Sequence, residues 1–248
     1  MTRLGLIGGS GLDHLDGVEV VSREVVETDW GAPSAALTLA RVGAHELVFL
    51  PRHGDRHQLP PHRINYRANI DALRRFGVDR VIAVAAVGAI DVSLPLSGIV
   101  VPHQIVDYTW GRAQTFFDDF TAGVRHVDFS DPFCPALRER LLAAARDESI
   151  PCVDGGVYAA TQGPRLESAA EIDRLARDGC TLVGMTGMPE AALAREAGLC
   201  YAILAIVVNP AAGREPGEIR MTDIERRLAS GVVSAMRIVQ HVLRHEER

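Results

Sequence analysis

Side chains that can bind an anion first occur in a glycine turn near the amino end of the chain. Residues 4–7 are apolar and lead into the turn 8–11, in which Ser10 adds a hydroxyl. Glycines let consecutive backbone N–H groups converge on an anion. The spacing matches neither the GxGxxG fingerprint nor a Walker loop. A plain tight turn is the alternative, so the phosphate interpretation depends on support from other segments.

The segment 51–62 is a second candidate for anion binding, because it holds two arginines and three histidines. Arg52 offers a planar fork of donors that matches phosphate, and His53 can donate a further bond. Metal binding by the histidines ranks lower, because the arginines would repel a cation and no cluster of carboxylates accompanies them. A solvated polar loop is the remaining alternative.

Two further positions could complete an anion site. Thr186 follows the short predicted strand 181–184 and is either a ligand hydroxyl or the cap of the next helix. Ala86 lies near the end of the predicted strand 80–87, where small residues would let a ligand lie against the backbone.

Asn209 and Glu167 are of a different kind, because they could bind the edge of a heterocycle. The run 199–208 is continuously apolar, as in a strand buried on both faces, and we expect it to stop at Asn209 because Pro210 cannot extend the ladder. An Asx turn is the alternative for Asn209, and a dipole-favoured acid before a helix is the alternative for Glu167. An anion held beside a heterocycle suggests that the anion itself is the attacking group.

The elements that must position these groups are those of an α/β protein. In a doubly wound sheet the ends of strands can converge on a ligand. With 248 residues and no linker-like stretch, we expect one domain, 1–248, built on a mixed, largely parallel twisted sheet flanked by helices. The pattern predicts strands at 4–7, 18–26, 36–42, 46–50, 80–87, 98–106, 156–161, 181–184 and 199–208, and helices at 65–76, 135–146, 168–177, 189–197 and 222–243.

Composition excludes several classes of function. The net charge is −6 with scattered basic residues, which argues against a nucleic-acid groove. We find no signal-peptide pattern and no apolar span of about 18 residues, so a cytoplasmic protein is expected. The cysteines are widely spaced, and we expect all of them to be reduced and buried: Cys134, Cys152, Cys180 and Cys200. The aromatic segment 107–120 suits a subunit interface.

Taken together, these motifs resemble the trimeric purine nucleoside phosphorylases, in particular the methylthioadenosine phosphorylase branch. The similar stretches are GLIGGSGL at 5–12, RHG at 52–54, NYRANI at 65–70, His126 with FCP at 133–135, GPR at 163–165, MT at 185–186, PE at 189–190 and AGLCYA at 197–202. The resemblance implies the nucleoside phosphorylase fold, a homotrimer, inorganic phosphate as co-substrate, and neither a metal nor an organic cofactor.

The resemblance also implies a role for each matching residue. It assigns phosphate binding to Ser10, Arg52, His53 and Thr186, with the backbone of Ala86 nearby. It places Met185 under the ribose and Leu166 and Ala211 beside the nucleoside, and it has His126 lent by the neighbouring subunit to the 5′ end. Met221 and Ile224 match apolar residues that line a 5′-methylthio pocket.

The departures from the family pattern concern the base. The methylthioadenosine enzymes carry two aspartates where this chain has Asn209 and Ala211, whereas the 6-oxopurine enzymes carry asparagine at the first position and a glutamate matching Glu167. The expected substrate is therefore 5′-methylthioinosine, with Asn209 and Glu167 as the catalytic pair. The alternatives are an inosine/guanosine phosphorylase, a methylthioadenosine phosphorylase, or a non-catalytic nucleoside-binding protein.

Overall fold

The computed structural model describes residues 3–9, 15–118 and 123–245, and eleven strands in these ranges form one sheet. Its centre consists of four mutually parallel strands, β1 (Arg3–Gly8), β4 (His45–Pro51), β5 (Val78–Ala89) and β11 (Cys200–Pro210). β1 lies between β4 and β5, and β11 pairs with the other edge of part of β5. The prediction of a mixed, largely parallel sheet is confirmed.

The remaining strands extend the sheet on both sides of this centre. They are β2 (Val18–Glu24), β3 (Leu37–Val42), β6 (Ile99–Val101), β7 (Gln104–Asp107), β8 (Cys152–Asp154), β9 (Val157–Ala160) and β10 (Leu182–Gly184). β2, β3 and β4 form the predicted antiparallel meander. β10 runs antiparallel to β5 and carries β9 and β7, whereas β6 runs antiparallel to β11 and carries β8.

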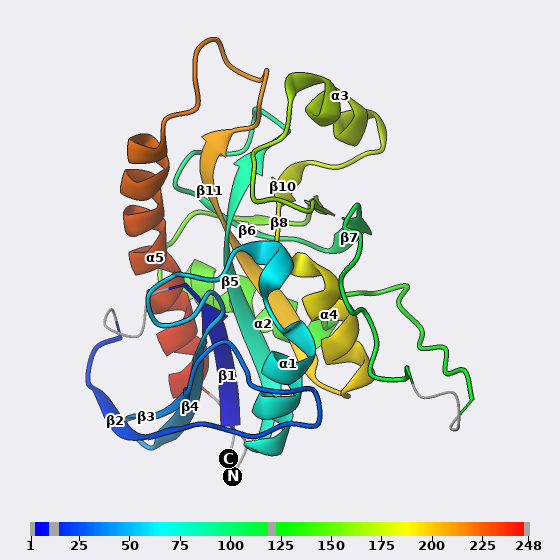
Figure 1. The fold of residues 1–248 in the computed structure, drawn as a ribbon. Helices are drawn as coiled ribbons and strands as arrows, with labels where there is room; N and C mark the ends of the chain where they lie inside the picture. Colours follow the sequence, from blue (N-terminus) through cyan, green and yellow to red (C-terminus); the bar gives the residue numbers. More distant parts are fainter. Residues whose placement is uncertain (1–2, 10–14, 119–122, 246–248) are drawn as a thin grey trace.

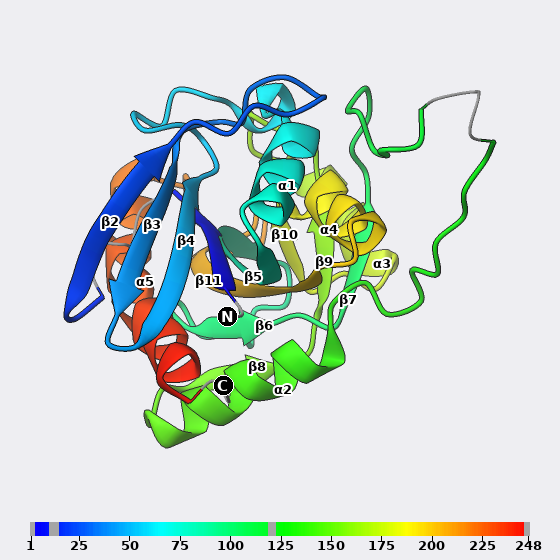
Figure 2. The same cartoon turned by 90° about the horizontal axis from the view of Figure 1, so that it is seen from below.

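Helices cover both faces of the central strands (Figures 1 and 2). α1 (Tyr66–Arg75) and α4 (Gly187–Glu196) pack on one face, and α2 (Pro135–Asp147) and α5 (Met221–Arg244) pack on the other. Side chains of β11 alternate between the two cores, so that Ile203 faces α1 and α4 while Leu204 faces α5. This burial on both faces explains why the strand is continuously apolar.

The smaller helix α3 (Ala169–Arg177) packs near β9 and β10. It begins with the predicted capping box of Ser168 and Glu171. The short 3₁₀ turn η2 (Pro61–Arg63) precedes α1. No helix in the described residues is both long enough and apolar enough to cross a membrane.

Two strand predictions were wrong in detail. The predicted strand 98–106 is divided into β6 and β7 around Pro102, and β8 was missed. β11 continues through Pro210, and the N–H of Ala211 still donates to the carbonyl of Ala89 at 2.7 Å. The paired segment of β6 ends opposite Ile206, so the end of β11 is an edge at which a proline is tolerated.

The expectation that all cysteines are reduced was also wrong. Cys134 and Cys200 form a disulfide with their Cα atoms 5.2 Å apart, although 66 residues separate them in sequence. The sheet brings them together, because the N–H of Cys134 donates to the carbonyl of Tyr201. The bond ties the start of α2 to the start of β11. Cys152 and Cys180 are free, as expected.

Candidate active site

The candidate anion site surrounds the second half of β5. β1 ends beside the middle of β5, where Ile7 pairs with Ala83. β10 approaches from the opposite direction, with Val183 paired to Gly88. The partners β1 and β10 therefore leave residues 84–87 of β5 between them, and Ala86 is exposed there. Ser10 lies outside the described residues.

The Arg52 side chain points into the protein near residues 84–88 of β5 and is only 2 % exposed. Its Nε and Nη2 donate to the two carboxylate oxygens of Glu190 at 2.8 Å each. Nη1 donates to the carbonyl of Val84 at 2.9 Å, and Nη2 also reaches that of Ile7 at 3.5 Å. These bonds engage all but one of the guanidinium N–H groups. Arg52 thus joins the end of β1 to the middle of β5, and one guanidinium N–H is not engaged by these bonds.

Glu190 is a residue that the sequence analysis missed. Its side chain is fully buried, and Oε1 accepts a further bond from the Tyr201 hydroxyl at 2.8 Å. Burial alone would lower the pKa of the Arg52 guanidinium, but the charge and hydrogen bonds of Glu190 outweigh it and raise that pKa. Glu190 is the only charged residue between 185 and 194, which was the available signal.

His53 follows Arg52 and is neutral over most of the pH range. Burial, together with the neighbouring Arg52 and His57, lowers the pKa of His53 to about 4. Its Nδ1 lies 2.8 Å from the carbonyl oxygen of Leu59, which can only accept, so Nδ1 carries the proton. Nε2 therefore has a free lone pair. In this state His53 would accept a bond from a protonated phosphate oxygen instead of donating one.

The loop between β10 and α4 supplies the next two predicted residues. Thr186 occupies the N-cap position of α4, but its side chain makes no capping bond. Its N–H lies 3.4 Å from the Tyr158 hydroxyl. Met185 is half-buried and lies against Gly163, where a Cβ atom would come within 2.4 Å of the Met185 sulfur.

A cavity of about 380 Å³ marks the candidate base site at the end of β11. Its lining brings together three predicted residues, Leu166, Asn209 and Ala211, with the loop that follows β11 and the start of α5. Asn209 is 8 % exposed and donates from Nδ2 to the Pro210 carbonyl at 2.6 Å. The second N–H and the amide oxygen remain as potential contacts for a purine.

Glu167 lies next to the cavity-lining Leu166 and is half-buried. Its Oε1 accepts a bond from the Thr161 hydroxyl at 2.6 Å, which fixes the carboxylate at the end of β9. A carboxylate held in this way can accept a bond from an N–H on a base.

Besides Met185 and Glu167, three residues predicted for the nucleoside site do not line this cavity. His126 is exposed and belongs to the segment 123–130. Figure 2 shows this segment away from the sheet. Met221 is 58 % exposed at the start of α5. Ile224 packs against the core between α2 and α5. The lining includes Arg220 and Asp223 from the same turn, which the sequence analysis did not select.

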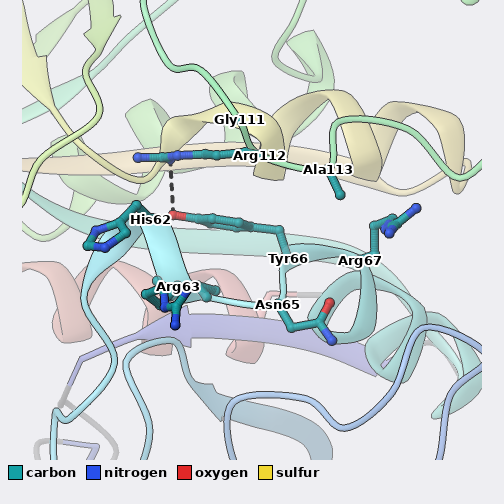
Figure 3. A pocket seen from close by; sticks show the side chains of 9 residues that line it. His62, Arg63, Asn65, Tyr66, Arg67, Gly111, Arg112 and Ala113 are labelled. Carbon is teal, nitrogen blue, oxygen red and sulfur yellow. Dashed lines mark hydrogen bonds between the residues drawn. The ribbon is translucent and has the colours of Figure 1, made fainter.

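A second cavity, of about 250 Å³, lies between the start of α1 and residues 111–113. Figure 3 shows the guanidinium of Arg112 opposite Tyr66, whose hydroxyl accepts from Arg112 Nη1 at 3.3 Å. The sequence analysis assigned this segment only to a subunit interface, and no sequence signal marked Arg112.

Comparison with known proteins identifies the family to which this fold belongs. Residues 3–244 match the phosphorylase superfamily. A probable S-methyl-5′-thioinosine phosphorylase from Pseudomonas syringae pv. tomato is 50 % identical over 98 % of this chain and 99 % of its own. A probable 6-oxopurine nucleoside phosphorylase from Thermococcus kodakarensis is 42 % identical over 92 % of this chain and 87 % of its own.

Solved structures agree with these relatives. The methylthioadenosine phosphorylase from Schistosoma mansoni in complex with adenine superposes with a TM-score of 0.92 at 34 % identity, covering 98 % of this chain and 91 % of that one. The chain therefore belongs to the phosphorylase superfamily, as an enzyme of the purine nucleoside and methylthioadenosine phosphorylase type.

Proposed function

We propose that the protein catalyses the reversible phosphorolysis of 5′-methylthioinosine to hypoxanthine and 5-methylthioribose 1-phosphate. The observation that carries this proposal is the presence of two uncharged residues, Asn209 and Ala211, in the lining of the base cavity, where the methylthioadenosine enzymes carry two aspartates. An amide can donate to O6 of a 6-oxopurine and accept from a protonated N7, whereas a carboxylate can only accept. Three relatives that are 49–50 % identical to this chain bear the name probable S-methyl-5′-thioinosine phosphorylase.

In the proposed reaction a phosphate oxygen forms a bond to C1′ while the C1′–N9 bond breaks. The electron pair of that bond moves to the purine, which takes up at N7 the proton that hydrogen phosphate releases on forming the ester, and C1′ gains oxocarbenium character. Asn209 stabilises the charge that develops on the departing base, and such a donor typically contributes about 3 kcal/mol to the transition state. Glu167, fixed by Thr161, accepts from N1–H of the base.

Phosphate would be held beside Ala86, which is exposed on β5. Thr186 offers its hydroxyl, His53 its Nε2 lone pair, and Arg52 its one disengaged N–H. Ser10 belongs to the same proposed set. In-line positioning of phosphate against C1′ supplies much of the remaining rate enhancement. The proposal needs inorganic phosphate as co-substrate and no metal or organic cofactor.

We further propose that the enzyme is a cytoplasmic homotrimer. The projecting segment carries the exposed Trp110 and His126, which suits a role at a neighbouring subunit. His126 would then reach the 5′ end of the nucleoside bound by the next protomer, and Met221 and Ile224 would border the methylthio group. The disulfide of Cys134 and Cys200 would be an uncommon feature in that compartment.

The variant Asn209→Asp tests the base assignment. We expect the ratio of kcat/KM for 5′-methylthioinosine to that for 5′-methylthioadenosine to fall by at least about 100-fold, because the new carboxylate cannot donate to O6. Using a ratio cancels any general loss of active enzyme. An unchanged ratio would remove Asn209 from base recognition.

Phosphate dependence separates the proposal from the other classes of function. Hypoxanthine should be released only when phosphate is present. Release without phosphate would indicate a hydrolase, and binding of the nucleoside without release under either condition would indicate a binding protein.

A further inference from the structure

The side chain of Arg112 makes six hydrogen bonds to residues that are distant in sequence. It lies in a segment without helix or strand and is half-buried. Its three nitrogens contact six oxygen atoms, of which four are backbone carbonyls. The fork reaches two loops that are far apart in sequence, one after β9 and one after β10. Figure 3 shows the guanidinium extended across the end of Tyr66.

One side of the fork holds the loop after β10. Nη1 donates to the carbonyl of Met185 at 2.9 Å and to that of Met188 at 2.6 Å. Thr186 lies between these two anchored residues. Arg112 thus holds the backbone on both sides of Thr186.

The other side of the fork holds the loop after β9. Nη2 donates to the carbonyls of Thr161 at 3.2 Å and Gln162 at 2.9 Å, and Nε donates to the Gln162 side chain at 3.2 Å. Thr161 is the residue whose hydroxyl binds Glu167. The same guanidinium thus supports the proposed base-binding carboxylate.

We propose that Arg112 is a positioning residue that fixes the separation of the phosphate-binding and base-binding loops. Converging carbonyl oxygens repel one another unless a cation lies between them, and a guanidinium does this with rigid, coplanar donors that lysine lacks. Phosphate must attack C1′ from the side opposite the departing base. A change in the separation of the two loops would therefore misalign phosphate and nucleoside and slow the reaction. This inference rests on the proposed phosphorolysis, although it does not depend on which nucleoside is preferred.

The test compares Arg112→Met and Arg112→Lys with the control Arg67→Met. Arg67 holds the same segment through the Thr115 carbonyl and Asp118 but contacts neither loop. Each variant is assayed on the nucleoside that the wild type cleaves fastest, with rates expressed per folded molecule. We expect Arg112→Met to lose at least about 100-fold in kcat/KM, with KM rising for both phosphate and nucleoside. Arg112→Lys should recover part of this loss.

Guanidinium or methylguanidinium added to Arg112→Met should restore activity in a saturable way, whereas Arg67→Met should keep wild-type kinetics with or without it. Wild-type kinetics in folded Arg112→Met would overturn the proposal. Equal losses in Arg67→Met would do so too, because anchoring of the segment would then account for the effect. A wild type that prefers another nucleoside contradicts the proposed substrate and leaves this comparison valid.

Discussion

The ion pair between Arg52 and Glu190 allows a quantitative test of how the interior of the active site is held together. The perturbation is Glu190→Gln, which keeps the shape of the side chain and removes its charge. Arg52 would then remain as a buried cation, since it is 2 % exposed and Glu190 is fully buried. The Tyr201 hydroxyl and Arg52 Nη2 could still bind the amide oxygen, but the amide nitrogen would face the Nε–H of Arg52, so the charge and one hydrogen bond are lost together.

The expected cost follows from burial. Removing one partner of a buried, hydrogen-bonded ion pair costs about 3–5 kcal/mol, because the remaining charge is neither solvated nor paired. Replacing both partners by apolar residues leaves no buried charge. The double variant Arg52→Met/Glu190→Leu should therefore be more stable than Glu190→Gln, even if it loses activity.

The assay is urea unfolding followed by circular dichroism at fixed protein concentration. Arg165 provides the control, because it also forms a bidentate pair, with Glu171 at 2.7 and 2.8 Å, but is 72 % exposed. Exposed pairs contribute little, so Arg165→Gln should change the midpoint by only a small fraction of the Glu190→Gln effect. Equal effects of the two variants, or a double variant less stable than Glu190→Gln, would refute the reasoning.

Two further predictions concern stability. Mass spectrometry of the unfolded, unreduced protein after alkylation should find Cys152 and Cys180 modified and Cys134 and Cys200 protected; breaking the disulfide should cost about 4 kcal/mol, as a closed loop of 66 residues implies, and four modified cysteines would contradict the pairing. His53 stays neutral in the folded state down to about pH 4 but is protonated near pH 6.5 when unfolded, so the unfolded state binds more protons between these values. Stability should therefore fall as the pH is lowered from 6.5 to 4, more steeply in the wild type than in His53→Gln, as measured by urea midpoints; parallel profiles would contradict the assigned environment.

The sequence predicted the fold well where a pattern is local. The apolar run of β11, the capping box of α3 and the amphipathic face of α5 each depend on residues close together in the chain. Asn209 and Leu166 were both selected before the structure placed them in one cavity. Topology explains this success, because strand ends with polar residues are the usual ligand sites of an α/β sheet.

Interactions between distant segments could not be predicted in the same way. Arg52 and Glu190 are separated by 138 residues, and nothing in either local pattern indicates their pairing. The cysteine pair was missed for the same reason. Arg112 lies outside every regular element, so no sequence periodicity indicates which residues its side chain contacts.

The most direct test of the proposed function is a comparison of kcat/KM for 5′-methylthioinosine, inosine and 5′-methylthioadenosine, measured on the purified wild type with phosphate in excess. The neutral amide at the end of β11 predicts preference for the 6-oxopurine over the 6-aminopurine, and the relationship to methylthio-nucleoside phosphorylases predicts preference for the methylthio group over the hydroxyl. 5′-Methylthioinosine should therefore have the highest value. A higher value for either of the other two nucleosides would contradict the proposed function.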